Sequence, residues 1–475
     1  MHVSEHFSLG KSQAMLDFVD VRHDTDIPLF VDPFAISIRK DELSDRCNDL
    51  IVSFFESLLN ALRSNDNTKA QSLLSKLTEP NETHLGLSRD KSAGRGVGPK
   101  QASQLIKAFK KSAAFKSGQL EDLSESTLFI HGIGSDKISD ITTNIIRGAL
   151  IEYTQQQCDL HSIPTSTISA GFCWDIENER WESVYQSLPL IDNYPVLLTP
   201  KYLVRRSISL NTQEFYNHHM LSYLQQEHLS SNSALVEVLK NGRRRVTKTK
   251  LKEHYPFDKD QIFDFVNKNP HVLEIYKKVK GAEGSLTNSE LQEDFREDEF
   301  SAALKLSLSK IPSGSENAHE YHEFMMGIIS FLFYPYLVFP VKEKPINDGR
   351  KRIDISYTNA ARSGFFENMS QNDSFNANFV PFECKNYSSD IGNPEIDQLA
   401  MRFSDQRGRL GFLLHRKFSD KTKLVRHCAD VARAGNGCVI AFDDNDIVEM
   451  LSAIERGQRR TLDQFLFRRL QEVHS

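Results

Sequence analysis

The pattern of apolar and polar positions divides the 475-residue chain into two parts. In the first part, five segments carry apolar residues at helical spacing, and four short apolar runs are typical of strands. The predicted helices are 50–63, 102–115, 139–157, 213–228 and 260–279, and the predicted strands are 18–23, 28–32, 166–174 and 195–199. We therefore expect a mixed, helix-rich α+β N-terminal region.

The last third of the chain alternates strand-like and helical segments. The predicted order is helix 317–333, strand 336–341, strand 352–357, strand 379–387, helix 394–403, strand 410–416, helix 420–434 and strand 438–442. Strands interleaved with helices indicate an α/β sheet. The polar segment 359–378 is rich in Asn and Ser, and it predicts a flexible loop or small hairpin between two of the strands.

Two polar stretches interrupt these patterns, at 281–294 and 307–319. Both are rich in Gly, Ser and Asn, which is typical of connecting segments. We place the main boundary at the second stretch. The expected organisation is an N-terminal mixed α/β recognition or regulatory region (1–235), a helical basic connector (236–306) and a C-terminal domain (307–475).

One apolar run approaches the length of a membrane span. Residues 324–341 carry no charge over 18 positions. Pro335 and Pro340 divide the run, so we predict a buried helix followed by a buried strand. The first residues lack a basic segment followed by an apolar core, and the six cysteines form no CxxC pair. We expect a cytoplasmic protein with no membrane partner.

The overall charge limits how the chain binds polyanions. Lys and Arg total 58 against 64 Asp and Glu, a net charge of −6, so a nucleic-acid site must be a local basic patch. Residues 239–252 hold seven basic residues and no acid. Phosphate contact is one interpretation and a solvated helix face is the other. The candidate phosphate contacts are Arg243, Arg244, Arg245, Lys248 and Lys250.

Two glycine-rich segments, 94–106 and 131–146, each precede a predicted helix. Neither has the spacing of a phosphate-binding P-loop. Both favour a turn at the start of a helix.

The candidate chemistry lies in the last third of the chain. Glu383 and Lys385 are two residues apart in an apolar strand, so their side chains leave the same face. Asp354 lies between two isoleucines in an earlier strand. If the two strands pair, both carboxylates converge on one point, which suits a hard cation such as Mg²⁺. Lys385 would then hold or deprotonate the attacking water.

This arrangement resembles the PD-(D/E)xK, restriction-endonuclease-like nuclease superfamily over about residues 313–475. The resemblance implies an α/β/α domain with a mixed central sheet, Mg²⁺ as the cofactor and Mn²⁺ as its substitute. The helix glutamate of the superfamily corresponds to Glu323, with Glu320 as the alternative. The implied catalytic residues are Asp354, Glu383, Lys385, Glu323 and Gln398, and the implied metal ligands are Asp354, Glu383, the main-chain carbonyl of Cys384, and Glu323.

The predicted helix at 394–403 adds two polar side chains. Gln398 and Arg402 are four residues apart and share one face, from which Arg402 would approach a phosphate beside the metal.

These features predict an Mg²⁺-dependent endonuclease that hydrolyses DNA, by analogy in bacterial restriction or anti-phage defence. Its expected partners are DNA and either a second copy of the chain or a defence-system protein. The alternatives are an RNA-cleaving or structure-specific repair nuclease and an inactive nucleic-acid-binding module of the same fold.

Overall fold

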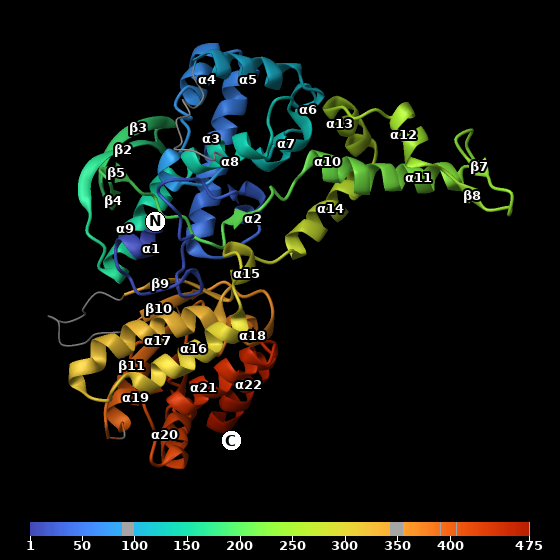
Figure 1. The fold of residues 1–475 in the computed structure, drawn as a ribbon. Coiled ribbons are helices and arrows are strands. Elements are labelled where there is room, and N and C mark those ends of the chain that lie inside the picture. Colours follow the sequence, from blue (N-terminus) through green and yellow to red (C-terminus); the bar gives the residue numbers. More distant parts are fainter. Residues whose placement is uncertain (88–98, 343–354, 390, 405, 475) are drawn as a thin grey trace.

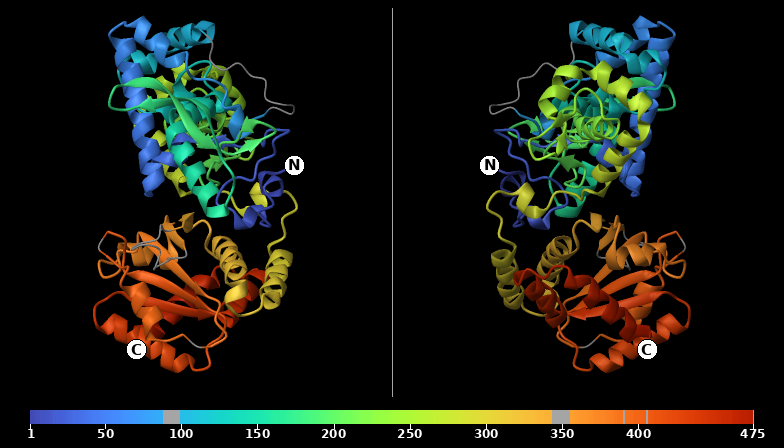
Figure 2. Two further views of the ribbon diagram at one scale, coloured as in Figure 1. Left: turned by 90° about the vertical axis from the view of Figure 1, so that its left-hand side faces the viewer. Right: turned by 90° about the vertical axis from the view of Figure 1, so that its right-hand side faces the viewer.

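The computed structural model describes residues 1–87, 99–342, 355–389, 391–404 and 406–474. These residues form two lobes, which are seen one above the other in Figure 1 and again in the side views of Figure 2. The chain passes from the N-terminal lobe to the C-terminal lobe after α15 (Asn288–Leu291). The predicted class is confirmed: the fold is mixed α/β, with a five-stranded mixed sheet in the C-terminal lobe.

The C-terminal sheet has the strand order β13-β12-β11-β10-β9. The strands are β9 (Leu337–Val341), β10 (Ile355–Asn359), β11 (Phe379–Lys385), β12 (Leu410–His415) and β13 (Cys438–Asp443). The pairs β9–β10 and β10–β11 are antiparallel, whereas β11–β12 and β12–β13 are parallel. Strand β11 is therefore central, with antiparallel and parallel neighbours on its two sides.

Helices pack against this sheet: α17 against β9 and β11, α19 against β12 and β13, and α20, α21 and α22 against β13. The C-terminal helices are α16 (Glu297–Lys310), α17 (Ala318–Phe333), α18 (Gly364–Gln371), α19 (Asn393–Ala400), α20 (Lys421–Arg433), α21 (Asp444–Glu455) and α22 (Thr461–His474). Aspartate caps fix two of the starts, because Asp420 accepts from Lys423 N and Asp443 from Asp446 N.

The predicted C-terminal elements are present with small shifts at their ends. Of the predicted strand 352–357, residues 352–354 lie outside the described residues. The predicted loop 359–378 is wrong in one respect, since it contains α18. Phe365, Phe366 and Met369 are buried on this helix, and their burial stabilises it in spite of the polar composition around them.

The N-terminal lobe is helix-rich, as predicted. Its helices are α1 (Val3–His6), α2 (Pro33–Ser37), α3 (Glu42–Arg63), α4 (Asn67–Leu74), α5 (Pro99–Lys111), α6 (Ala113–Lys116), α7 (Ser126–Phe129), α8 (Ser135–Ile145) and α9 (Arg147–His161). Its strands are β1 (Phe30–Val31), β2 (Ser166–Asp175), β3 (Arg180–Leu188), β4 (Leu190–Ile191), β5 (Tyr194–Pro195) and β6 (Val204–Arg205). The glycines of the segment 94–98 lie outside the described residues.

Several predicted N-terminal elements need correction. Helix 139–157 is two helices, α8 and α9, that meet at Ile146. The predicted strand 18–23 forms only isolated bridges, because Phe18 lies opposite Pro200 and proline has no N–H to continue a ladder. Of the predicted strand 195–199, only Pro195 lies in a strand, β5, which pairs with β4.

The following segment forms an arm on one side of the N-terminal lobe (Figure 1), with residues 259–268 packed against α6 and α7. It comprises α10 (Thr212–Glu214), a π-helical turn (Phe215–Met220), α11 (Leu221–Ser230), β7 (Glu237–Val238), β8 (Arg244–Arg245), α12 (Lys248–His254), α13 (Lys259–Lys268) and α14 (Pro270–Ala282). The predicted helix 260–279 is divided into α13 and α14 because Pro270 cannot continue α13.

The predicted boundary between 306 and 307 falls within α16, which packs against α21. The polar stretch before α16 is the connection between the lobes.

The apolar run 324–341 is part of α17 followed by β9, as predicted. Among the described residues, no helix combines the length and apolar character that crossing a bilayer requires.

Candidate active site

Strand β11 carries the central pair of the candidate site. Its register sets Phe382 opposite Ile355 of β10, and Glu383 opposite Leu413 of β12. Phe382 and Cys384 are buried, as predicted for the core side of the strand. Glu383 is also buried, with only 1% of its surface exposed, because the strand is central and covered on both faces.

Glu383 lies between two cations. The Nζ atom of Lys385 is 2.6 Å from Oε1, and the Arg402 guanidinium donates to Oε2. The Lys385 and Arg402 side chains are 17% and 9% exposed. A buried carboxylate is costly unless it is paired, and these two partners provide the pairing.

One oxygen of Glu383 is incompletely satisfied. Within the described part of the chain, the buried Oε1 accepts no hydrogen bond of good geometry, although it lies close to the Lys385 ammonium. Carboxylate oxygens are the ligands that Mg²⁺ takes, and the Lys385 ammonium beside Oε1 shows that this position favours a positive charge. The residues present therefore fit a hard divalent cation.

Packing just after α19 positions Arg402. The next residue, Phe403, lies against Gly411 of β12 and against Gly437, where a Cβ would collide with the phenyl ring. The packing of Phe403 holds the C-terminal end of α19 against the sheet and directs Arg402 to Glu383. Gln398 lies one turn earlier on α19 and is half-buried.

The chain after Lys385 is also fixed. The Asn386 side-chain amide donates to the carbonyls of Pro312 and Gly314 at 3.0 and 2.8 Å, and the main-chain carbonyl of Asn386 accepts from Gly314 N at 2.7 Å. The end of β11 is thereby tied to the loop that precedes α17, the helix of the candidate glutamate.

That glutamate, Glu323, has an unexpected partner. Lys11, from the N-terminal lobe, places its Nζ 2.6 Å from Glu323 Oε2. The alternative, Glu320, is exposed to solvent. Nothing in the sequence connects Lys11 with Glu323, since 312 residues separate them and neither belongs to a shared motif.

Helix α17 is anchored near Glu323 by a second polar contact. The Tyr321 hydroxyl donates to Asp444 Oδ1 at 3.0 Å, and Arg416 Nε lies 3.0 Å from the other oxygen of that carboxylate. Burial raises the pKa of Asp444 to about 6, and Arg416 and the Tyr321 hydrogen bond oppose the rise. These contacts fix the side of α17 that faces the end of β13.

The other predicted catalytic residue, Asp354, lies outside the described residues. The described part of β10 begins at Ile355, which pairs with Phe382 directly before Glu383. The described structure thus brings together Glu383, Lys385 and Arg402, and it places Glu323 on a helix that packs against the same strand.

The basic segment 239–252 is a hairpin followed by a helix. Arg243, Arg244 and Arg245 are exposed at β8, near the far end of the arm (Figure 1). Arg245 Nε and Lys250 Nζ lie 3.1 and 2.9 Å from the Glu237 carboxylate. We call the segment from Glu237 to Arg245 the basic hairpin.

Lys248 donates to the carbonyl of Asn217 at 2.7 Å. This contact ties the start of α12 to the π-helical turn before α11.

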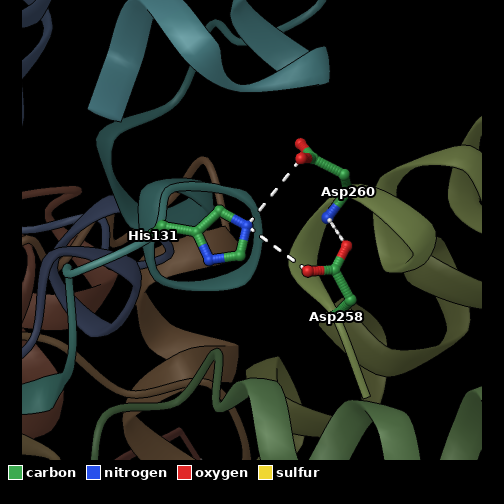
Figure 3. Close-up of side chains that lie close together, drawn as sticks. All are labelled: His131, Asp258 and Asp260. Carbon is green, nitrogen blue, oxygen red and sulfur yellow. Dashed lines mark hydrogen bonds and ion pairs between the residues drawn. The ribbon is translucent and has the colours of Figure 1, made fainter. Parts of the chain in front are cut away.

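A separate cluster lies in the N-terminal part of the molecule (Figure 3). His131 Nε2 is 3.6 Å from Asp258 Oδ2 and 3.8 Å from Asp260 Oδ2, and these three atoms lie within metal-binding distance of one another. The Oδ1 atoms accept from backbone amides, Asp258 from Gln261 and Asp260 from Ala113. Helix capping and an ion pair account for this partly exposed arrangement.

Residues 8–211 match a family model described as a domain of unknown function (DUF8370). No curated protein matches the chain. A solved structure entitled "Structure of restriction endonuclease FokI bound to DNA" aligns at 10% identity, covering 90% of this chain and 79% of that one, with a TM-score of 0.24.

Proposed function

We propose that the protein is a metal-dependent nuclease that hydrolyses DNA phosphodiester bonds in the C-terminal lobe. The observation that carries the proposal is Glu383, a buried strand carboxylate with Lys385 two residues later and one oxygen that lacks a well-aligned donor. A structural ion pair would not need this burial, since such pairs usually lie at the surface and contribute little.

The chain's own residues supply the polar groups that phosphodiester hydrolysis requires. Lys385 is partly exposed next to Glu383, so its ammonium can hold a water molecule or stabilise charge on a phosphate. Arg402 can reach the same space if its pair with Glu383 opens.

The proposed metal ligands are Glu383, Asp354, Glu323 and the Cys384 carbonyl, with Mg²⁺ as the metal and Mn²⁺ as its substitute. The metal would lower the pKa of a bound water molecule and stabilise negative charge on the phosphate. Gln398 is proposed as a further polar contact from α19.

The basic hairpin supports binding to DNA. Its arginines are exposed on an arm that extends from the main body, where a long polyanion has access (Figure 1). Lys248 and Lys250 on α12 continue this basic surface. Such contacts are to phosphates and are insensitive to base sequence.

The proposed setting, cytoplasmic restriction or anti-phage defence with a second copy or a defence-system protein as partner, rests on the superfamily resemblance alone. RNA as the substrate, a repair role and an inactive binding module remain the alternatives, and substrate choice separates them.

A cleavage assay with purified protein tests the proposal. Supercoiled, linear and single-stranded DNA and RNA are incubated with Mg²⁺ or Mn²⁺ and with EDTA. We expect metal-dependent cutting of DNA that is lost in Asp354→Ala and Glu383→Gln, and retained in Glu449→Gln, whose carboxylate is exposed on α21. Cutting by Glu383→Gln at the wild-type rate would contradict the proposal.

A further inference from the structure

The N-terminal segment 11–17, here called the strap, lies along α17 of the C-terminal lobe. Ala14 and Met15 of the strap belong to the hydrophobic core of the C-terminal lobe and not to that of their own lobe. A Cβ at position 327 would collide with the Met15 side chain, so Gly327 provides the space that the strap occupies. The strap is therefore a packed part of the nuclease lobe.

The strap is fixed at its far end as well. Asp17 is buried and accepts from Phe339 N of β9 at 3.0 Å and from the Tyr153 hydroxyl of α9 at 2.8 Å. Strand β9 is the edge of the sheet, and the strap covers part of it. Both ends of the strap are thus anchored, one on β9 and the other on α17.

Lys11 is the strap residue that contacts Glu323, the proposed metal ligand on α17. Glu323 lies one helical turn before Gly327 on α17. Because Met15 packs against Gly327, Lys11, four residues before Met15, lies next to Glu323. The Lys11 side chain is only 7% exposed and that of Glu323 is 29% exposed. Because the packing around Lys11 restricts its side chain, the ion pair keeps its geometry, and salt screens it only weakly.

From this geometry we infer that Lys11 is a positioning residue of the nuclease site. Its ammonium pairs with the Glu323 carboxylate and competes with a metal ion for that ligand. The inference rests on the proposed function. A divalent cation that uses Glu323 must displace the Lys11 ammonium, so metal binding and the Lys11 contact are coupled, and each weakens the other. The N-terminal lobe thereby sets the metal affinity of the C-terminal lobe.

A cavity beside Lys11 offers space for the displaced ammonium. Lys11 lines a cavity of about 980 Å³ on the N-terminal side of the strap. The residues that line the cavity include Glu5, Asp20, Asp26, Glu290 and Glu293. We expect the displaced Lys11 side chain to turn into this cavity, where an acidic residue would replace Glu323 as its partner.

Mn²⁺ binding to the full-length protein, measured by titration calorimetry, tests the inference. The variants are Lys11→Met, Lys11→Arg, Glu323→Gln and the double variant Lys11→Met/Glu323→Gln, with Glu383→Gln to identify binding at the nuclease site. We expect Lys11→Met to tighten Mn²⁺ binding about tenfold, a usual size for coupling between sites. Lys11→Arg, which keeps the cation, should bind as the wild type does. The double variant should match Glu323→Gln alone, since the coupling requires both side chains.

The outcomes separate this inference from the proposed function. If binding depends on Glu383 and Lys11→Met leaves it unchanged or weakens it, the role of Lys11 is wrong while the nuclease proposal stands. If no variant shows Glu383-dependent Mn²⁺ binding, the metal site itself is overturned. Lys11→Gln replaces Lys11→Met should the latter fail to fold, as judged by near-ultraviolet circular dichroism.

Discussion

Two groups of charged side chains in this molecule lie in opposite environments. Around β11, Glu383, Lys385 and Arg402 are buried or nearly buried, and their charges are paired at short distances. In the basic hairpin, Arg243 and Arg244 are exposed, and the Arg245 pair with Glu237 is open to solvent. Both groups are candidates for phosphate contact, but the physical consequences of their placement differ.

Burial determines what each group can do. Around Glu383, charges act at low effective dielectric and in fixed positions, so removing one changes both the chemistry and the folding free energy. On the hairpin, water and salt screen each charge, so an arginine contributes to attraction of a polyanion and little else. Substitutions around Glu383 should therefore reduce both cleavage and stability, whereas substitutions in the basic hairpin should reduce only DNA binding.

The largest expected effect is that of Lys385→Ala. Loss of the ammonium should slow DNA cleavage about 10²- to 10⁴-fold, the size of a lost acid–base or electrostatic contribution. Mn²⁺ binding should largely survive, because the carboxylates remain. Single-turnover cleavage and calorimetry measure the two quantities. Lys417→Ala, at an exposed lysine of the same lobe, is the matched control and should cut normally.

Arg402→Ala tests whether the site is also structural. The substitution leaves Glu383 Oε2 buried without its donor, which should reduce the free energy of unfolding by about 1–3 kcal/mol. Urea denaturation measures this loss. Arg433→Ala, which breaks an exposed pair with Asp430 on α20, should cost no more than about 0.5 kcal/mol. Equal losses in the two variants would remove the distinction between buried and exposed charges in this protein.

The comparison also shows what the sequence can predict. The strands around the site are continuous apolar runs, because a central strand such as β11 is buried on both faces, and this signal locates them correctly. Helix α18 is not predicted because its buried residues, Phe365, Phe366 and Met369, form one short apolar face within a polar stretch. In that segment tertiary packing outweighs composition.

The candidate site is predictable only in part. The spacing of Glu383 and Lys385 places both on one strand, and that relation is local. The contact of Arg402 with Glu383 depends on Phe403 packing at Gly411 and Gly437, which no spacing rule contains. The contact of Lys11 with Glu323 arises from the docking of one lobe on the other, so local sequence patterns carry no sign of it.

The smallest effect is expected at the basic hairpin. The triple variant Arg243→Ala/Arg244→Ala/Arg245→Ala should weaken DNA binding to all sequences alike and reduce the slope of log K against log salt by about 0.9 for each phosphate that the variant no longer neutralises. Fluorescence anisotropy over a salt series measures the slope. Stability should change by no more than about 0.5 kcal/mol, because the side chains are exposed. A charge-matched control replaces Arg180, Arg296 and Arg433, each exposed and paired with an acid. If the control lowers the slope as much as the hairpin variant does, the effect comes from net charge, and the hairpin is a solvated surface without a specific role in DNA binding.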